Sequence, residues 1–218
     1  MKVLAVIPAH NEARMIASVV RAVRDLGHDV VVIDDGSADG TGDLAHSAGA
    51  HVIATGRKSG KGNALRQGFA YALAEGYQGV VTLDGDGQHN PADIAIILNV
   101  QAESHAAVVN GNRMNNAQGM PLVRLLTNKF MSWAISSLCR QSVPDTQCGF
   151  RFIGADVLKA VSLECNDFEI ETELLVKASR KGFAIASAPV ETIYNGEVSK
   201  INPVKDTWRF IRFIMRSL

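Results

Sequence analysis

Short apolar runs alternate with helical patterns through the first half of the chain. The runs at 2–7, 30–33 and 79–83 are rich in β-branched residues and continuous rather than alternating, as expected for parallel strands covered on both faces. Apolar residues at helical spacing predict helices between these runs, at 13–26, 39–47, 63–74 and 92–100. This order predicts an α/β fold with an open, mostly parallel sheet flanked by helices.

The second half of the chain has a less regular pattern. Apolar segments at 106–110, 150–153 and 184–194 indicate further strands, and residues 115–119 a mobile loop. Helical patterns cover 121–139, 168–180 and 208–218. Because no repeat, linker or low-complexity tract interrupts the pattern, we predict a single domain at 1–218.

Composition narrows the class of protein. Lys and Arg together number 22, as do Asp and Glu, so the formal net charge is zero, which argues against bulk binding of nucleic acid. Three cysteines without metal-site or disulfide spacing favour reduced thiols and a cytoplasmic protein. The start of the chain is too short for a signal-peptide core, and no apolar run approaches the ~18 residues that span a bilayer.

Polar clusters follow three of the expected strands, at 8–12, 34–41 and 84–89. Ligands of open α/β sheets bind at the carboxyl ends of the strands. Asp84 and Asp86 flank a glycine, so in an extended segment their carboxylates lie on the same side and a bound cation relieves their repulsion. Hard oxygen ligands favour Mg²⁺ or Mn²⁺, with Gln88 as a neutral third ligand. The alternative is that these acids only shape turns.

Other nucleotide-binding classes fit these clusters poorly. The chain has no GxGxxG after its first strand and no GxxxxGK[ST] anywhere, which weighs against a dinucleotide-binding fold and a P-loop.

Read together, these segments resemble a known family. The motifs of family 2 glycosyltransferases with the GT-A fold are similar to Pro8-Ala9-His10-Asn11-Glu12, Asp34-Asp35-Gly36-Ser37-Ala38-Asp39-Gly40-Thr41 and Asp84-Gly85-Asp86-Gly87-Gln88-His89. The dolichyl- and polyprenyl-phosphate sugar synthase branch is further matched by 60–65, 145–151 and Ser199-Lys200. The resemblance covers nearly the whole chain. It implies a GT-A-type domain with a nucleotide-sugar-binding half at 1–114 and an acceptor half at 115–218.

The resemblance also implies an activity and a set of site residues. The activity is inverting transfer of a sugar from a GDP- or UDP-linked donor to a polyprenyl phosphate or related lipid, with one Mg²⁺ or Mn²⁺. Pro8, Ala9 and Glu12 would line the nucleoside pocket, and Asp35 would bind the base. Arg113 and Arg151 would lie near phosphates. The implied donor-binding residues are Pro8, Ala9, Asn11, Glu12, Asp35, Lys61, Asp84, Gly85, Asp86, Arg113 and Lys200; the metal ligands are Asp84, Asp86 and Gln88; the catalytic residues are Asp86, Arg113, Arg151 and Glu171.

The acceptor decides whether a general base is needed. A phosphate is already anionic at pH 7, whereas a sugar hydroxyl must lose a proton to a base, usually a carboxylate. Glu171 matches the base position of relatives that act on hydroxyls, but it also fits a first-turn acid that stabilises a helix N-terminus. Transfer to a glycan hydroxyl and a non-catalytic nucleotide-sugar-binding subunit therefore remain alternatives, and a nucleotidyltransferase is a weaker one.

Two apolar helical segments bear on partners. In the C-terminal segment, one stripe contains Trp208, Ile211, Met215 and Leu218, and another contains Arg209, Arg212 and Arg216. Such a helix either lies in a membrane interface or packs on the protein body. The first reading implies the cytoplasmic face of a membrane, with membrane contact or a membrane-protein partner. The 121–139 segment is expected to supply core residues or to line a lipid groove, through Phe130, Met131, Trp133, Ile135 and Leu138.

Overall fold

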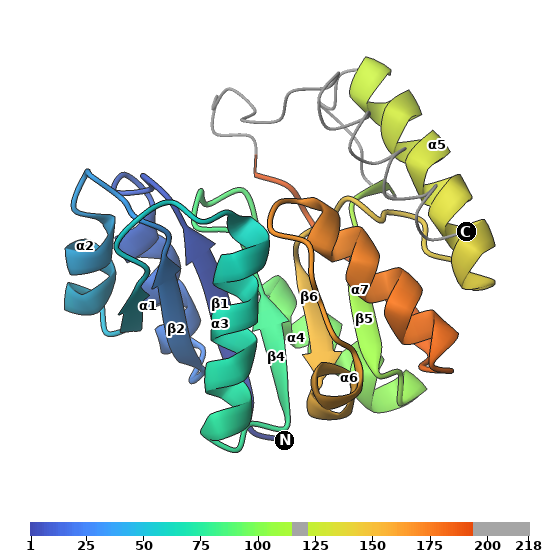
Figure 1. Ribbon diagram of the computed structural model, residues 1–218, viewed down its shortest axis with the longest axis horizontal. Helices are drawn as coiled ribbons and strands as arrows, with labels where there is room; N and C mark the ends of the chain where they lie inside the picture. Colours follow the sequence, from blue (N-terminus) through green and yellow to red (C-terminus); the bar gives the residue numbers. More distant parts are fainter. Residues whose placement is uncertain (115–121, 194–218) are drawn as a thin grey trace.

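One mixed sheet organises the computed structural model, which describes residues 1–114 and 122–193. Its seven strands lie in the order β3-β2-β1-β4-β6-β5-β7 (Figure 1). The strands are β1 (Val3–Ala9), β2 (Asp29–Asp34), β3 (His51–Ala54), β4 (Gly79–Thr82), β5 (Val108–Asn112), β6 (Arg151–Gly154) and β7 (Ile185–Pro189). β3, β2, β1 and β4 are parallel, β5 and β7 are parallel, and β6 runs antiparallel to both of its neighbours.

Helices cover both faces of this sheet. They are α1 (Ile16–Asp25), α2 (Thr41–Ser47), α3 (Lys61–Ala74), α4 (Asp93–Ser104), α5 (Leu122–Cys139), α6 (Ala155–Ala160) and α7 (Glu169–Arg180). One apolar core joins the sheet to α1, α2 and α4. The other joins it to α3, α5, α6 and α7. The fold is therefore the three-layered, mostly parallel α/β sandwich expected from the sequence.

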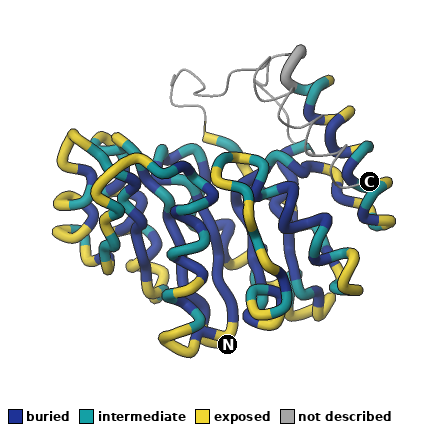
Figure 2. Tube along the Cα trace, in the orientation of Figure 1, coloured by how far each residue is buried: buried dark blue, intermediate teal, exposed yellow. Residues whose placement is uncertain are grey.

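The buried strands show why the sequence forms this sheet. Every residue of β4 is buried, and so are the first five residues of β1, so these continuous apolar runs face helices on both sides. Figure 2 shows the same dark-blue interior, with exposed positions mostly in the loops. α3 lies close against β1 because Gly68 packs directly on Val6, where a Cβ atom would collide with the valine side chain.

Some expected boundaries were wrong. The four-residue β3 and the six-residue α6 had not been anticipated. β3 is an edge strand with exposed or half-buried side chains, so it lacks a continuous apolar run. The strand expected at 184–194 ends at Pro189. In α5, Met131 and Ile135 are core residues as expected, but Phe130 and Trp133 are exposed.

Two further expectations fall elsewhere. The loop at 115–119 and the helix at 208–218 lie outside the described residues. Among the residues that are described, no helix is long and apolar enough to cross a membrane.

Candidate active site

The polar loops after β1, β2 and β4 meet at one edge of the sheet. β1 is paired in parallel with both other strands, so their carboxyl ends point the same way. The first two loops are joined by hydrogen bonds: the Asn11 amide donates to Ser37 Oγ over 2.9 Å, and the Ala38 amide donates to Asn11 Oδ1 over 2.9 Å. The Glu12 amide donates to Thr41 Oγ1 over 2.8 Å. These bonds fix the loop after β1 to the loop after β2.

Lys61 lies between two carboxylates that come from opposite halves of the chain. Its Nζ is 2.6 Å from Asp84 Oδ1 and 2.7 Å from Glu171 Oε1. The Lys61 and Glu171 side chains are only 15% and 13% exposed, so water screens these ion pairs weakly. Burial favours a neutral lysine, but the two carboxylates outweigh it and raise the pKa of Lys61. The sequence had grouped Lys61 with the donor site without indicating this bridge.

Asp84 has a second partner on its other side. His89 Nε2 is 3.4 Å from Asp84 Oδ2, and His89 is buried. Burial alone would raise the pKa of Asp84, but the charge of Lys61 and the hydrogen bond from His89 hold that pKa well below its ordinary value. Asp84 is therefore a fixed anion.

Gly149 leaves room for this cluster. A Cβ atom at Gly149 would lie 3.0–3.1 Å from Glu171 Oε1, Asp84 Oδ2 and Lys61 Nζ. A side chain at this position would therefore crowd all three charged groups.

Asp86 lies beside the charge of Asp84 and, within the described residues, forms no ion pair with a cation. Its Oδ1 accepts the amide of Gln88 over 3.0 Å, yet burial and then the neighbouring charge of Asp84 raise the pKa of Asp86. A divalent cation held by Asp84, Asp86 and Gln88 would relieve this repulsion, and the oxygen donors suit Mg²⁺ or Mn²⁺. Among the described residues, no three His, Cys, Asp or Glu side chains form a metal-binding group.

Asp35, expected to bind the base, instead holds the segment that leads into α3. Its carboxylate accepts the Ser59 amide over 2.7 Å, the Ser59 hydroxyl over 2.6 Å and the Gly60 amide over 2.8 Å. Burial favours the neutral acid, but these hydrogen bonds prevail and lower the pKa of Asp35. The structure thus gives Asp35 a role in placing Lys61, which begins α3. A contact with the base stays a prediction.

The two arginines expected near phosphates have internal partners. Arg113 forms a two-pronged ion pair with Asp145, at 2.7 Å from Nε to Oδ2 and 3.0 Å from Nη2 to Oδ1, and Asp145 is fully buried. Arg151 is 1% exposed, and it donates to the carbonyl oxygens of Cys148, Thr146 and Glu171 over 2.6–2.8 Å. These arginines fix the 145–149 segment and the first turn of α7, and phosphate contacts by them stay a prediction.

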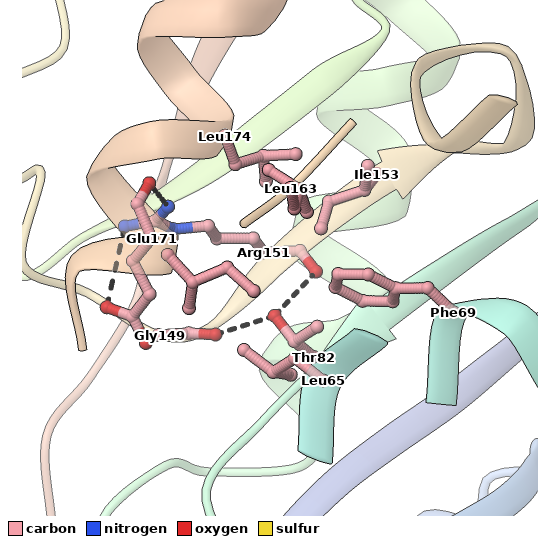
Figure 3. A pocket seen from close by; sticks show the side chains of 10 residues that line it. Leu65, Phe69, Thr82, Gly149, Arg151, Ile153, Leu163, Glu171 and Leu174 are labelled. Atoms are coloured by element: carbon pink, nitrogen blue, oxygen red, sulfur yellow. Dashed lines mark hydrogen bonds and ion pairs between the residues drawn. The ribbon is translucent and has the colours of Figure 1, made fainter. Parts of the chain in front are cut away.

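Figure 3 shows how Arg151 lies against Glu171 beside a cavity of about 10 Å³. Arg151 Nη2 is 3.8 Å from Glu171 Oε2, so cations flank both oxygens of this carboxylate. Thr82 donates to the carbonyl oxygen of Gly149 over 2.7 Å, which fastens the end of β4 to the segment beneath Glu171. The lining is mostly apolar: Leu65, Phe69, Thr82, Gly149, Arg151, Ile153, Leu163, Ile170, Glu171 and Leu174.

The remaining expected residues take the following places. Pro8 and Ala9 end β1 at the same edge, and Gly85 packs beside Ala9 and Glu12. Lys200 lies outside the described residues. The structure therefore brings together the clusters at 8–12, 34–41 and 84–89 with Lys61 and Glu171. The contact of His89 with Asp84 and the room that Gly149 leaves for the cluster were not expected; the only sequence signal for either was the residue's place within its motif.

Comparisons with known proteins find relatives over most of the chain. Residues 4–161 match the profile of glycosyl transferase family 2. An undecaprenyl-phosphate mannosyltransferase of Micrococcus luteus is 33% identical over 205 residues, which cover 87% of this chain and 83% of that protein. A UDP-N-acetylglucosamine–dolichyl-phosphate N-acetylglucosaminyltransferase of Methanococcus voltae is 30% identical over 212 residues, covering 87% and 84%.

The fold has counterparts among solved structures. Glucosyl-3-phosphoglycerate synthase of Mycobacterium tuberculosis, in complex with Mn²⁺, UDP and phosphoglyceric acid, superposes with a TM-score of 0.75 at 18% identity, over 99% of this chain and 76% of that one. The likeness supports the expected GT-A-type fold.

Proposed function

The chain belongs to the family 2 glycosyltransferases, and from this membership we propose that it transfers a sugar from a nucleoside diphosphate to a polyprenyl phosphate. The relatives named for undecaprenyl and dolichyl phosphate are at least 30% identical over most of their length, which supports a lipid-phosphate acceptor. Because such a lipid lies in a bilayer, the reaction would take place at a membrane surface.

The carboxylate cluster after β4 serves the donor in this proposal. Asp84 and Asp86, with Gln88, would hold a divalent cation, which as a Lewis acid stabilises the departing diphosphate. Asp84 is kept ionised by Lys61 and His89, so it needs no deprotonation before it binds a cation. The ammonium group of Lys61 adds a fixed positive charge at the place where negative charge develops on the leaving group.

The acceptor argument depends on Glu171. Its Oε1 is paired with Lys61 at 2.7 Å, and its Oε2 lies 3.8 Å from Arg151. A general base must accept the proton of the incoming hydroxyl, whereas both oxygens of this carboxylate already lie beside cations of the chain. A phosphate acceptor needs no base. An oxygen of the phosphate attacks the anomeric carbon, and the bond from that carbon to the diphosphate oxygen breaks with its electron pair. A single displacement of this kind inverts the anomeric centre.

The pairing of Glu171 with Lys61 is the single observation that carries this choice. It favours the lipid phosphate over the alternative acceptor, a glycan hydroxyl activated by Glu171.

A matched pair of acceptors tests the proposal. The purified protein with Mn²⁺ is given labelled GDP-mannose, UDP-glucose or UDP-N-acetylglucosamine, and either a polyprenyl phosphate or the polyprenol of the same length. We expect a labelled lipid with one donor and only with the phosphate. Transfer to the polyprenol or to a glycan, with none to the phosphate, would contradict the proposal. Binding of a nucleotide without any transfer would instead support a non-catalytic subunit.

A further inference from the structure

Three large apolar side chains stand out from α5 on the side that faces away from the sheet. Leu126, Phe130 and Trp133 are 59%, 64% and 67% exposed. Their spacing of four and three residues places them in one stripe of the helix, and the Phe130 and Trp133 rings lie 6.1 Å apart. The opposite side already fills the core through Met131 and Ile135. α5 therefore carries an apolar face that the core does not use.

The charged residues of α5 itself are all of one sign. α5 contains no Asp or Glu. Lys129 lies within the helix and Arg140 follows its last residue, and both are exposed. At 100° per residue, Lys129 falls on the border of the Leu126–Phe130–Trp133 stripe, and Arg140 lies just past the end of the helix with a left-handed φ of 51°. Exposed Trp and Phe bordered by cations are typical of helices that lie in the interface of an anionic bilayer.

The inner side of α5 contacts the segment that supports the candidate site. The Thr146 amide donates to Ser132 Oγ over 2.9 Å, and the Thr146 carbonyl accepts from Arg151. α5 also packs beside α7, which carries Glu171 (Figure 1). A surface that receives the outer face of α5 would therefore lie next to the acceptor half of the chain.

We propose that the outer face of α5, made of Leu126, Lys129, Phe130 and Trp133, docks on a phospholipid bilayer that carries anionic headgroups, together with Arg140 just after the helix. The aromatic stripe enters the interface, and the two cations pair with lipid phosphates. The inference goes beyond the proposed function, because it rests on the exposure and charge of α5. Only the reason for docking, access to a lipid acceptor, rests on the proposed function.

Vesicle binding tests the docking face directly. The full chain is sedimented with phosphatidylcholine vesicles that contain phosphatidylglycerol but neither polyprenyl phosphate nor sugar donor. We expect Phe130→Ser/Trp133→Ser to lower vesicle partitioning at least about tenfold, since the variant lacks the two aromatic side chains that would be buried in the lipid interface. The matched control is Leu44→Ser/Ile96→Ser, which removes two exposed apolar side chains from α2 and α4 and should leave partitioning unchanged. Equal partitioning of both variants would overturn the proposal.

Fluorescence shows which segment enters the lipid. The chain has two tryptophans, Trp133 and Trp208, so Trp208→Phe leaves Trp133 as the sole reporter. Docking predicts a blue shift of its emission when vesicles are added. Vesicle binding without that shift would assign the contact to another segment. An emission already blue-shifted without vesicles would show that the chain itself or a second copy covers the face. Either result would refute the proposal.

The vesicles hold no acceptor, so the two proposals fail separately. Vesicle binding without transfer to polyprenyl phosphate would refute the proposed function alone. If the Phe130→Ser/Trp133→Ser variant both transfers sugar to the lipid and binds vesicles as well as the wild-type protein does, the docking face alone is refuted.

Discussion

The ammonium group of Lys61 shows how one side chain ties the two halves of the site together. It lies within 2.7 Å of both Asp84, from the first half, and Glu171, from the second. Removing the ammonium group would leave the carboxylates of Asp84 and Glu171 facing each other. The resulting repulsion destabilises the folded state more than the intact ion pairs stabilise it. Lys61 is therefore expected to control both the shape of the site and its electrostatic field.

Replacing Lys61 tests this role. We expect Lys61→Met to lower kcat/KM by about a hundredfold, because Asp84 and Glu171 then repel each other and the positive charge near the leaving group is lost. Glu171→Gln alone should cost less, because no general base is removed. In the double variant the repulsion is relieved, so its loss should be smaller than the product of the single losses. Steady-state kinetics with polyprenyl phosphate measures all three. Multiplicative losses would show that the two residues act independently.

Sequence reasoning reached only part of the site at this scale. The sequence indicated Asp84 and Asp86 as candidate site residues, since two acids around a glycine after an apolar run have few structural explanations. The partnership of Lys61 with Glu171 was not, because 110 residues separate them and only the folded sheet brings α3 and α7 together. The internal partners of Arg113 and Arg151 could not be read either, because a motif does not reveal which carbonyl or carboxylate will pair with a guanidinium group.

At the scale of elements, a buried glutamate holds α7 to the start of α3. Glu173 is 2% exposed. It accepts the amides of Glu164 and Cys165 over 2.9–3.0 Å and pairs with Lys177 at 2.6 Å. The carbonyl oxygen of Asn166, the residue after Cys165, accepts the Gly62 amide over 2.7 Å. Gly62 has no side chain to obstruct this contact, since a Cβ atom there would collide with the Cys165 carbonyl. Glu173 thus supports the 164–166 segment, which contacts the first turn of α3, where Lys61 lies.

Neutralising Glu173 should destabilise the protein in a pH-dependent way. At pH 7 we expect Glu173→Gln to lower the free energy of unfolding by about 1.5–3 kcal/mol, because charge-assisted hydrogen bonds are lost. Burial opposes ionisation, but the hydrogen bond from Lys177 and those from the two amides prevail and lower the pKa of Glu173. Its stabilising contribution is therefore complete above the ordinary value of 4.5 and is lost as pH falls through the lower folded value.

Urea unfolding at pH 7 and at several values below 4.5 measures this effect. The difference between wild type and Glu173→Gln should shrink with acidification. The control is Glu164→Gln, whose side chain is 78% exposed and which should change stability by less than about 0.5 kcal/mol. A difference that stays constant with pH would show that the charge of Glu173 does not matter.

The elements themselves were readable where their pattern was strong. β4 and the amphipathic α1 lie within the expected ranges, and β1 and β2 extend one or two residues beyond theirs. β3 was missed because an edge strand needs few apolar residues. The reversed direction of β6 could not be read, since a four-residue strand has the same pattern in either direction. For α5 the sequence left open whether its apolar residues form core or line a lipid groove, because its two apolar faces are indistinguishable in sequence, and only the packing shows which one the core uses.

At the scale of the whole molecule, the site is built at the expense of stability. Asp86 is an acid whose pKa is raised by burial and by Asp84, so its ionised form destabilises the folded state at neutral pH. Loss of that charge would make the folded state more stable. A destabilising charge that is nevertheless present is typical of a functional site. The folded state is therefore expected to be stabilised strongly by a ligand that supplies a cation here.

Thermal unfolding separates the structural cost of Asp86 from its use. With a nucleoside diphosphate at a hundred times its Kd, binding stabilises the folded state by about 2.7 kcal/mol, which in a domain of this size raises Tm by about 5–10 °C. We expect that rise with Mn²⁺ present, for either GDP or UDP but not both, and a much smaller rise without the ion. Asp86→Ala should abolish the Mn²⁺-dependent part while leaving the Tm of the ligand-free protein unchanged or higher, because a destabilising charge is removed. A ligand-free variant that melts well below wild type would mean that Asp86 is structural, and an undiminished Mn²⁺-dependent rise in the variant would place the cation elsewhere.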